Sequence, residues 1–430
     1  QAYNQTFNSL LENEADGWLK SQRVAAFARF EHLGFPSRKV ENWKYTNTRY
    51  LADQEFNLAT SYNLSAAKEL LANQGLQLDA YRLVLVNGVF CPELSNLKNL
   101  PDACVIEPLS QGLETNLETT CGLIGRFAGL DTDVFTAFNL AYVKEGAVIR
   151  LGKEVTLSKP LLISYLSTYE AGADKSSEHF MSHPRVVIAA GSNSQFELIE
   201  EFISQADAAN LTNRVLEGVL ERNVQLNHSL IQQVGCQDTW VGRIEIEVKK
   251  QATYNCYHLN LGGKLVRDDL SNNLTGEGAN SNLRGLLIGK GKQHLDAHTL
   301  ATPNAQAINS YANYRSLLDD SARGVFNTRV VVTKEGAKTF AEQRNANLLL
   351  NEAAHIDTKP ELEIYNDDVA CAHGATTGQL DADAIFYLQS RGLTHEEAVA
   401  QLTLAFAESL LTSFARPEIV NFAHQRLLGQ

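Results

Sequence analysis

Features that define several common protein classes are missing from this 430-residue chain. No stretch approaches the roughly 18 consecutive apolar residues that a membrane-spanning helix needs. The amino terminus also lacks the basic segment followed by an apolar one that marks a secretion signal. We therefore expect a cytoplasmic protein that does not associate with a membrane.

Clusters of basic residues are missing as well. The formal net charge is −13 at pH 7, and no run or helix is rich in lysine and arginine. Nucleic acids and anionic lipids are bound through clustered positive charge. The sequence therefore argues against a nucleic acid partner and favours a protein partner or a small ligand.

Nucleotide-binding motifs are incomplete. "GLLIGK" falls one residue short of the spacing in GxxxxGK[ST], and "GEGANS" lacks the third glycine of a dinucleotide fingerprint. We expect this chain to bind no nucleotide, so any ATP consumed in its work must be bound by a partner.

Cysteines are few and widely spaced. No CxxC pair occurs among the six, which are Cys91, Cys104, Cys121, Cys236, Cys256 and Cys371. Neither a zinc ribbon nor a dense disulfide framework is indicated. We expect reduced thiols, and any set of metal ligands must assemble from distant segments or from separate chains.

What is present divides the chain into three regions. Residues 1–143 carry helical patterns and form a mixed, helix-rich region. From 144 to 378, short runs of β-branched and apolar residues alternate with Gly, Asn and Asp, which is typical of strands joined by tight turns. Residues 379–430 are helical again.

The helical ends have recognisable boundaries. Apolar residues recur at helical spacing over 6–33, and a capping box spans Thr394 to Glu397. Pro417 stands where a last helix would begin. The carboxy-terminal helices carry apolar stripes, which fit either capping of the β region or docking of a partner.

The β region contains weak internal repeats. Similar segments recur about every 27 to 30 residues, namely "AGSNSQFELIEEF", "LERNVQLNHSLIQQVG", "VKKQATYNCYHLNLGG" and "EGANSNLRGLLIGKG". Such a period predicts a solenoid in which each coil packs on its neighbours. A parallel β-helix explains the pattern better than the alternative, a long antiparallel β protein, because two-residue hairpin turns are scarce.

A thiol and an imidazole stand two residues apart in "VACAHG". On a strand, Cys371 and His373 would point to the same side and could share a metal. Two ligands are fewer than zinc or an iron-sulfur cluster requires. The spacing alone favours a buried, inert pair, and it makes a Cys-His nucleophile less probable still, because a third residue would have to orient the base.

A second polar row lies in "HLDAHT". His294, Asp296 and His298 occupy one face of a predicted strand and would suit a metal-dependent hydrolase. Polar residues spaced by two are also what the solvent face of a solenoid requires, and we favour that interpretation. His258, in "NCYHLN", would lie on a neighbouring coil, and the sequence does not place it nearer to either group.

Residues 357–393, "DTKPELEIYNDDVACAHGATTGQLDADAIFYLQSRGL", closely resemble a known signature. The SufB/SufD family of iron-sulfur cluster assembly proteins carries D-T-K-P-x-L-E-I, then D-D-V-x-C-x-H-G-A-T-x-G and F-Y-L-x-S-R-G. "DDSARGVFNTRVVV" is similar to the family's R-x-V-F-N segment. "ENWKYTNTRYL" and the chain length are more typical of SufD than of the longer SufB.

This resemblance implies a fold and a set of partners. The expected architecture is a central right-handed parallel β-helix with an amino-terminal mixed helical region and a carboxy-terminal helical region. The β-helix would pair with SufB, and the carboxy-terminal helices would bind SufC, an ABC-type ATPase, in a SufBCD complex. Alone, the chain might be expected to pair with itself. It would be a non-catalytic scaffold subunit.

The resemblance also assigns a role to the Cys-x-His pair. A transient iron-sulfur cluster would form at the SufB interface, with His373 as the ligand from this chain and Cys371 as a less certain second ligand. Two enzyme alternatives stay open from the sequence. One is a carbohydrate-cleaving β-helix, which would normally carry a secretion signal, and the other is the hydrolase built on His294, Asp296 and His298.

Overall fold

The computed structural model describes residues 2–12, 17–131, 133–168, 179–205 and 209–427. Its helices are α1 (Ala2–Glu12), α2 (Trp18–Leu33), α3 (Arg49–Asp53), α4 (Leu64–Gln74), α5 (Leu109–Thr115), α6 (Leu117–Cys121), α7 (Val134–Tyr142), α8 (Ala382–Ser390), α9 (His395–Leu411) and α10 (Pro417–Leu427), with short 3-10 turns η1 (Glu41–Trp43) and η2 (Pro92–Leu94). The helices predicted over 6–33 are confirmed as α1 and α2, although residues 13–16 lie outside the described part.

Strands fill the middle of the chain, as its alternating pattern predicts. The first are β1 (Asn57–Leu58), β2 (Tyr81–Val86), β3 (Val89–Phe90), β4 (Cys104–Pro108), β5 (Gly146–Leu151), β6 (Leu161–Ser167), β7 (Phe180–Ser182), β8 (Arg185–Ala190), β9 (Gln195–Ser204) and β10 (Leu211–Leu220). The remainder are β11 (Gln225–Gln233), β12 (Thr239–Val248), β13 (Thr253–Asn260), β14 (Leu265–Leu274), β15 (Asn280–Gly289), β16 (His294–Pro303), β17 (Asn309–Leu318), β18 (Arg323–Val332), β19 (Thr339–Leu349), β20 (His355–Ile364) and β21 (Val369–Gly378).

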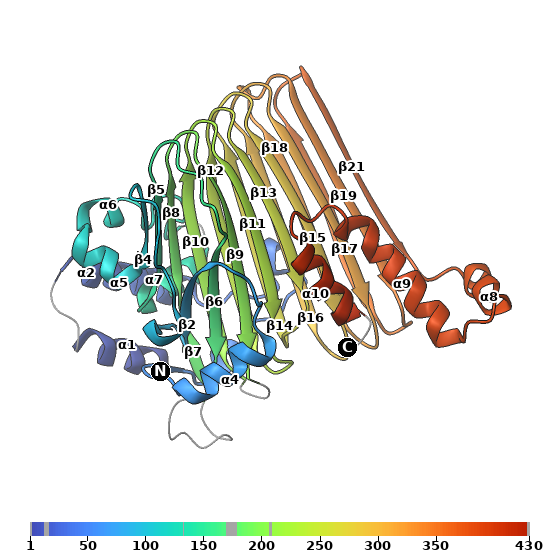
Figure 1. The fold of residues 1–430 in the computed structure, drawn as a ribbon, viewed down its shortest axis with the longest axis horizontal. Helices are drawn as coiled ribbons and strands as arrows, with labels where there is room; N and C mark the ends of the chain where they lie inside the picture. Colours follow the sequence, from blue (N-terminus) through green and yellow to red (C-terminus); the bar gives the residue numbers. More distant parts are fainter. Residues whose placement is uncertain (1, 13–16, 132, 169–178, 206–208, 428–430) are drawn as a thin grey trace.

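These strands alternate between two stacked sheets and form a β-solenoid (Figure 1). One sheet runs β20-β18-β16-β14-β12-β10-β8-β5-β4, and the other runs β21-β19-β17-β15-β13-β11-β9-β6-β2-β3. Neighbours from β5 to β21 pair in parallel, whereas β2 with β3 and β4 with β5 are antiparallel. The predicted parallel β-helix is therefore confirmed, and the antiparallel alternative is wrong.

The register of the ladders gives the length of each coil. Thr239 pairs with Leu211, 28 residues earlier, and with Leu265, 26 residues later. The longest offset joins Arg323 to His355, 32 residues apart. The irregular repeat in the sequence is this variation in coil length, which is absorbed by the turns because the strands stay in register.

One corner of each coil depends on a residue with a left-handed backbone. The φ angle is positive at successive corners, at Asn193, Asn223, Gln251, Gly278 and Ala307. Each of these residues donates its backbone N–H to a carbonyl of the next coil, as Asn223 does to Lys250 at 2.9 Å. Asn and Gly adopt this conformation at little cost, which explains their recurrence in the turns.

Apolar residues occupy three kinds of place. The interior between the sheets holds a continuous core from Tyr81 to Ala341. On the outer face of the first sheet, α1, α2 and α7 pack over Val148, Val187 and Val241. The outer face of the second sheet is covered by α4 near β2 and by α9 and α10 along β11 to β19.

The carboxy-terminal helices lie along the side of the solenoid. Leu410 and Phe414 pack on outward-facing residues such as Ile231 and Leu286, so α9 and α10 do not cap the last coil. The predicted capping box at Thr394 and Glu397 is confirmed, and α10 begins at Pro417 as expected. In contrast, α8 projects away from the sheets (Figure 1).

The amino-terminal region does not stand apart from the solenoid. Its strand β2 pairs in parallel with β6, and β4 pairs with β5, so this region closes the first end of both sheets. The three-part division of the chain stays a prediction. Among the described helices, none is long and apolar enough to cross a membrane.

Replacing Leu410 by Ala should loosen the carboxy-terminal helices. Leu410 is fully buried against the second sheet, and removal of such a side chain costs about 2–5 kcal/mol. Thermal unfolding followed by circular dichroism should show a lower melting temperature. The control Leu117→Ala removes a side chain that is 53% exposed, and an equal loss in both variants would contradict the packing described here.

Candidate functional site at the open end of the solenoid

Strand β21 carries Cys371 and His373 on the last coil. They pair in register with Ala341 and Gln343 of β19, whose side chains are buried in the solenoid interior. Because side chains alternate along a strand, Cys371 and His373 continue this inward-facing row. No further coil follows, so His373 is exposed and Cys371 is half-buried.

Strand β20 forms the facing wall of this open end. Thr358 continues the inward row of its sheet above Phe326, and its Oγ1 donates to Asn345 Oδ1 at 2.8 Å. Gln343 Nε2 donates to the carbonyl of Glu361 at 3.3 Å. These bonds tie the two walls together one coil below His373 and leave the last layer open.

The described residues of this chain supply at most two ligands here. They contain no group of three or more His, Cys, Asp or Glu side chains that could hold a metal ion. Burial raises the pKa of the Cys371 thiol, and a hydrogen bond with the Ala341 backbone opposes this only in part. Since metals bind the thiolate, His373 is the better donor of the two.

Two of the sequence-based alternatives for this pair fail. A buried, inert pair is wrong for His373, because its side chain is exposed. No hydrogen bond joins Cys371 to His373 in the described structure, and no third side chain orients the imidazole. A nucleophile with its base needs both contacts.

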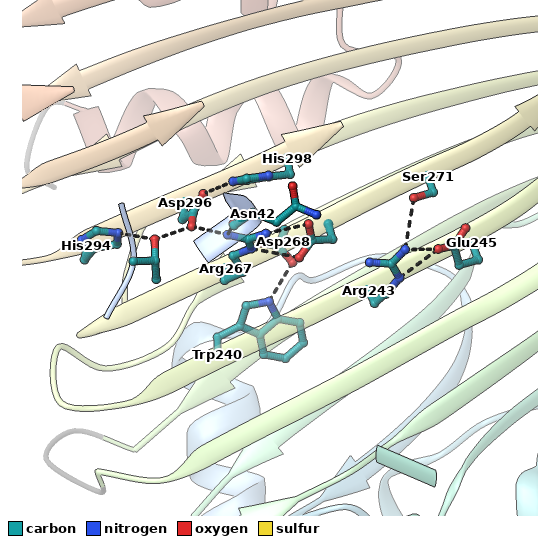
Figure 2. A network of polar contacts seen from close by, with 12 residues as sticks. Asn42, Trp240, Arg243, Glu245, Arg267, Asp268, Ser271, His294, Asp296 and His298 are labelled. Carbon is teal, nitrogen blue, oxygen red and sulfur yellow. Dashed lines mark hydrogen bonds and ion pairs between the residues drawn. The ribbon is translucent and has the colours of Figure 1, made fainter. Parts of the chain in front are cut away.

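The row His294, Asp296 and His298 lies elsewhere, on the outer face of β16, and it is not solvated (Figure 2). Asp296 is fully buried, so the solvent-facing interpretation is wrong. Its Oδ2 accepts from Arg267 Nη1 at 2.7 Å, and His298 Nε2 lies 2.9 Å from its Oδ1. Burial would raise the pKa of Asp296, but the Arg267 guanidinium and His298 hold it well below its usual range.

The amino-terminal segment that contains Trp43 and Thr46 covers this row. Thr46 Oγ1 donates to Asp296 Oδ2 at 2.5 Å, so the 2.9 Å contact with His294 Nε2 is completed by a proton on the imidazole. The Arg267 guanidinium lies 4.1 Å from the centre of the Trp43 ring and donates to the carbonyl of Asn42 at 2.7 Å. The "WKYT" segment is thus docked on the first sheet by a buried ionic network.

His258 belongs to neither group. It faces the solenoid interior, where its Nε2 lies 3.1 Å from Asp268 Oδ2, and Trp240 donates to Asp268 Oδ1 at 2.8 Å. The wall of the first sheet separates it from Asp296.

Sequence reasoning missed a set of charged residues inside the solenoid. Glu200 Oε1 lies 2.8 Å from both Arg214 Nη2 and His228 Nε2, and Tyr165 and Tyr254 donate to this group. Burial lowers the pKa of His228 even though Glu200 favours its charged form. Every strand position of one parity reads as core, so only the polarity of these residues at such positions hinted at a network.

The fold and the end coil together define a class. This is a parallel β-solenoid protein whose first end is closed by its own strands and whose last coil is open, with a thiol and an imidazole on its inner face. The chain belongs to the SufBD family of the SUF system for iron-sulfur cluster assembly. Residues 173–406 match the family's core domain, and residues 1–163 match its amino-terminal region. The family resemblance drawn from the sequence is therefore confirmed.

Curated relatives agree over almost the full length. The chain is 29% identical to the iron-sulfur cluster assembly protein SufD of Escherichia coli over 97% of this chain and 95% of that protein. It is 29% identical to an iron-sulfur cluster assembly SufBD family protein of Synechocystis over 94% and 89%, and 24% identical to SufD of Bacillus subtilis over 93% and 90%.

Replacing Asp296 by Asn should weaken the docking of the amino-terminal segment. Arg267 would keep a buried charge without its partner, at a cost of about 3 kcal/mol. Because the pKa of Asp296 is lowered in the folded state, its contribution is present above the unfolded pKa near 4 and is lost in stronger acid. The difference in unfolding free energy from the original chain should therefore be constant near neutral pH and shrink below about pH 4.

The control for this substitution is Asp79→Asn. Asp79 pairs with Lys159 at the surface and its side chain is 80% exposed, so the loss of stability should be slight. Equal melting temperatures for Asp296→Asn and the original chain at pH 7 would show that the network does not hold the segment.

Proposed function

We propose that this chain is a non-catalytic scaffold subunit of a SufBCD complex, working in the cytoplasm. It pairs with SufB through the β-helix and with the ATPase SufC through the carboxy-terminal helices, and it contributes His373 to a nascent iron-sulfur cluster. The observation that supports this most directly is the exposed His373 on the inner face of the last coil. The printed names of the relatives, SufD among them, point to the same process.

Pairing with SufB is supported by the two open edges. In the described structure, β20 and β21 each have a hydrogen-bonded neighbour on one side only. Long edge strands expose unpaired backbone groups, which makes them templates for pairing with another chain. A second solenoid docked end to end would satisfy those groups and would complete the ligand set around His373. A second copy of this chain would use the same edges when SufB is absent.

Pairing with SufC is supported by α8. Its Phe386 and Tyr387 side chains are 72% and 55% exposed, and α8 has no buried residue. The preceding and following elements are fixed on the solenoid, since α9 packs on β15 and β17. An apolar pair held out from a fixed base suits a protein groove. The two helices α9 and α10 would then act mainly as this base.

A cluster held in this way would be transient. His373, with Cys371 as a weaker second ligand, provides fewer donors than a stable cluster needs. The raised pKa of Cys371 further disfavours its thiolate form. The missing ligands would come from SufB, so separation of the subunits would release the cluster to an acceptor.

The enzyme alternatives have no support in the site. His294, Asp296 and His298 are covered by Thr46 and engaged by Arg267, which leaves no place for a substrate. The carbohydrate-cleaving alternative is wrong on the family, since the SufBD family is one of assembly proteins.

His373→Ala should lower cluster formation severalfold without preventing assembly of the complex. The side chain is exposed, so its removal should change stability by no more than about 0.5 kcal/mol. The measurement is the iron-sulfur absorbance after anaerobic reconstitution of the co-purified three-subunit complex. The matched control is His355→Ala on β20, whose side chain is 56% exposed and faces outward beside Asp357. A normal cluster yield from His373→Ala would remove this residue from the site.

The double variant Phe386→Ala/Tyr387→Ala should weaken binding of the SufC-like ATPase by about 2 kcal/mol or more, as expected for central apolar contacts. Isothermal titration of the ATPase into the purified chain measures this. The control Ile364→Ala/Tyr365→Ala removes an exposed pair, 43% and 60%, at the end of β20. If the two double variants bound equally well, α8 would not be the docking element.

A further inference from the structure

A cavity of about 690 Å³ lies on the side of the solenoid, far along the chain from the last coil. Three successive corners form its wall: the turn after β11, the turn after β13 and the turn after β15. The end of α10 closes it. Its lining includes the apolar side chains of Leu261 and Ile288, the exposed thiol of Cys236, and the amide of Gln237.

Four cationic side chains line this cavity, and no acidic one does. They are Lys264, Lys290, Lys292 and Arg426, which come from separate parts of the chain and gather only in the fold. This is why no basic run is visible in the sequence.

None of the four cations has an ion-pair partner among the described residues. Lys264 lies 4.7 Å from the centre of the Tyr50 ring, and Arg426 donates to Gln233 Oε1 at 2.7 Å. The contrast is the opposite corner of the coils, where Lys249 and Lys250 pair with Glu221 and Glu277, both at 2.9 Å. The nearby Asp320, one coil further on, accepts from the backbone N–H of Gly291 and does not line the cavity.

Gathering unpaired like charges has an energetic cost. Each cation repels the others, and the repulsion is relieved when an anion enters between them. In a chain with a net charge of −13, such a positive site is a local exception. It also attracts small anions that the rest of the surface repels.

We propose that this cavity binds a small oxyanion with two or more charged groups, either a polyphosphate-type or a polycarboxylate-type molecule. The volume falls within the range of about 300–1,000 Å³ that is usual for small-molecule sites, which is more than a single phosphate fills. Leu261 and Ile288 provide an apolar floor for an organic part. The site lies on the coils from β11 to β16, so it is separate from His373 and from α8, and it does not depend on the proposed function.

The test uses the full chain with inorganic pyrophosphate and with citrate as the two probes, at low ionic strength. Calorimetric titration should show one site for at least one probe, and preference for pyrophosphate or citrate identifies the phosphate or carboxylate class. Cys236 lies in the lining, so saturation with the bound probe should slow its alkylation by iodoacetamide about tenfold. The rate at Cys371, measured on its own peptide by mass spectrometry, should not change.

The matched variants separate this site from general electrostatics. Lys290→Gln/Lys292→Gln should weaken binding about tenfold, because two cations in contact with an anion each contribute on the order of 1 kcal/mol or less at a surface. Lys249→Gln/Lys250→Gln removes the same charge from the opposite corner and should leave binding unchanged. Both pairs lie in or beside exposed turns, so the fold is preserved.

Three results would overturn the proposal. The first is no binding of either probe at millimolar concentration. The second is an equal loss of affinity in the two double variants. The third is an unchanged alkylation rate at Cys236 when the probe is saturating, which would place the bound anion elsewhere.

Discussion

The stacking of coils through parallel backbone ladders is the constraint on which the rest of this structure depends. Each strand must find hydrogen-bond partners in the coils before and after it, and this requirement fixes the register of β5 to β21. It also places a left-handed residue at each corner, where the N–H of one turn bonds to the next. A stack of this kind has two ends. The amino-terminal strands β2, β3 and β4 close one of them, while β20 and β21 leave the other open, and it is there that Cys371 and His373 lie.

The outer faces of the sheets pose a second problem, because each strand also presents side chains away from the interior. The chain covers these faces with its own ends. On the first sheet, Arg267 and Asp296 form a buried ion pair that is satisfied by Thr46 and the carbonyl of Asn42. Buried charges stabilise only when they are paired and hydrogen-bonded, so this network specifies where the amino-terminal segment docks. On the second sheet, α9 and α10 dock through apolar contacts alone. The two ends therefore use different physics to reach the same result.

The sequence predicted those features that depend on local patterns. The alternation of residues, the coil period, the capping box at Thr394 and the start of α10 at Pro417 are all local, and all are confirmed. Contacts between distant segments were not predictable. His294 and Asp296 read as a solvent-facing row because nothing near them in the chain reveals that Thr46 returns to cover them. Glu200, Arg214 and His228 were missed for a similar reason, since their partners come from separate coils. The exposure of His373 was hidden because a two-residue spacing does not say which coil is the last.

The open edges and the Cys-x-His pair lie on the same coil, and under the proposed function this has a thermodynamic consequence. If docking of a second solenoid supplies ligands to a cluster at His373, then the cluster must stabilise the docked state by the same free energy. Neither partner would need to bind tightly alone. A site complete within one chain would lack this coupling, because its affinity for a cluster would not change when the other subunit leaves. An incomplete site is thus the arrangement in which movement of the subunits, driven by a partner that hydrolyses ATP, can control how long a cluster is held.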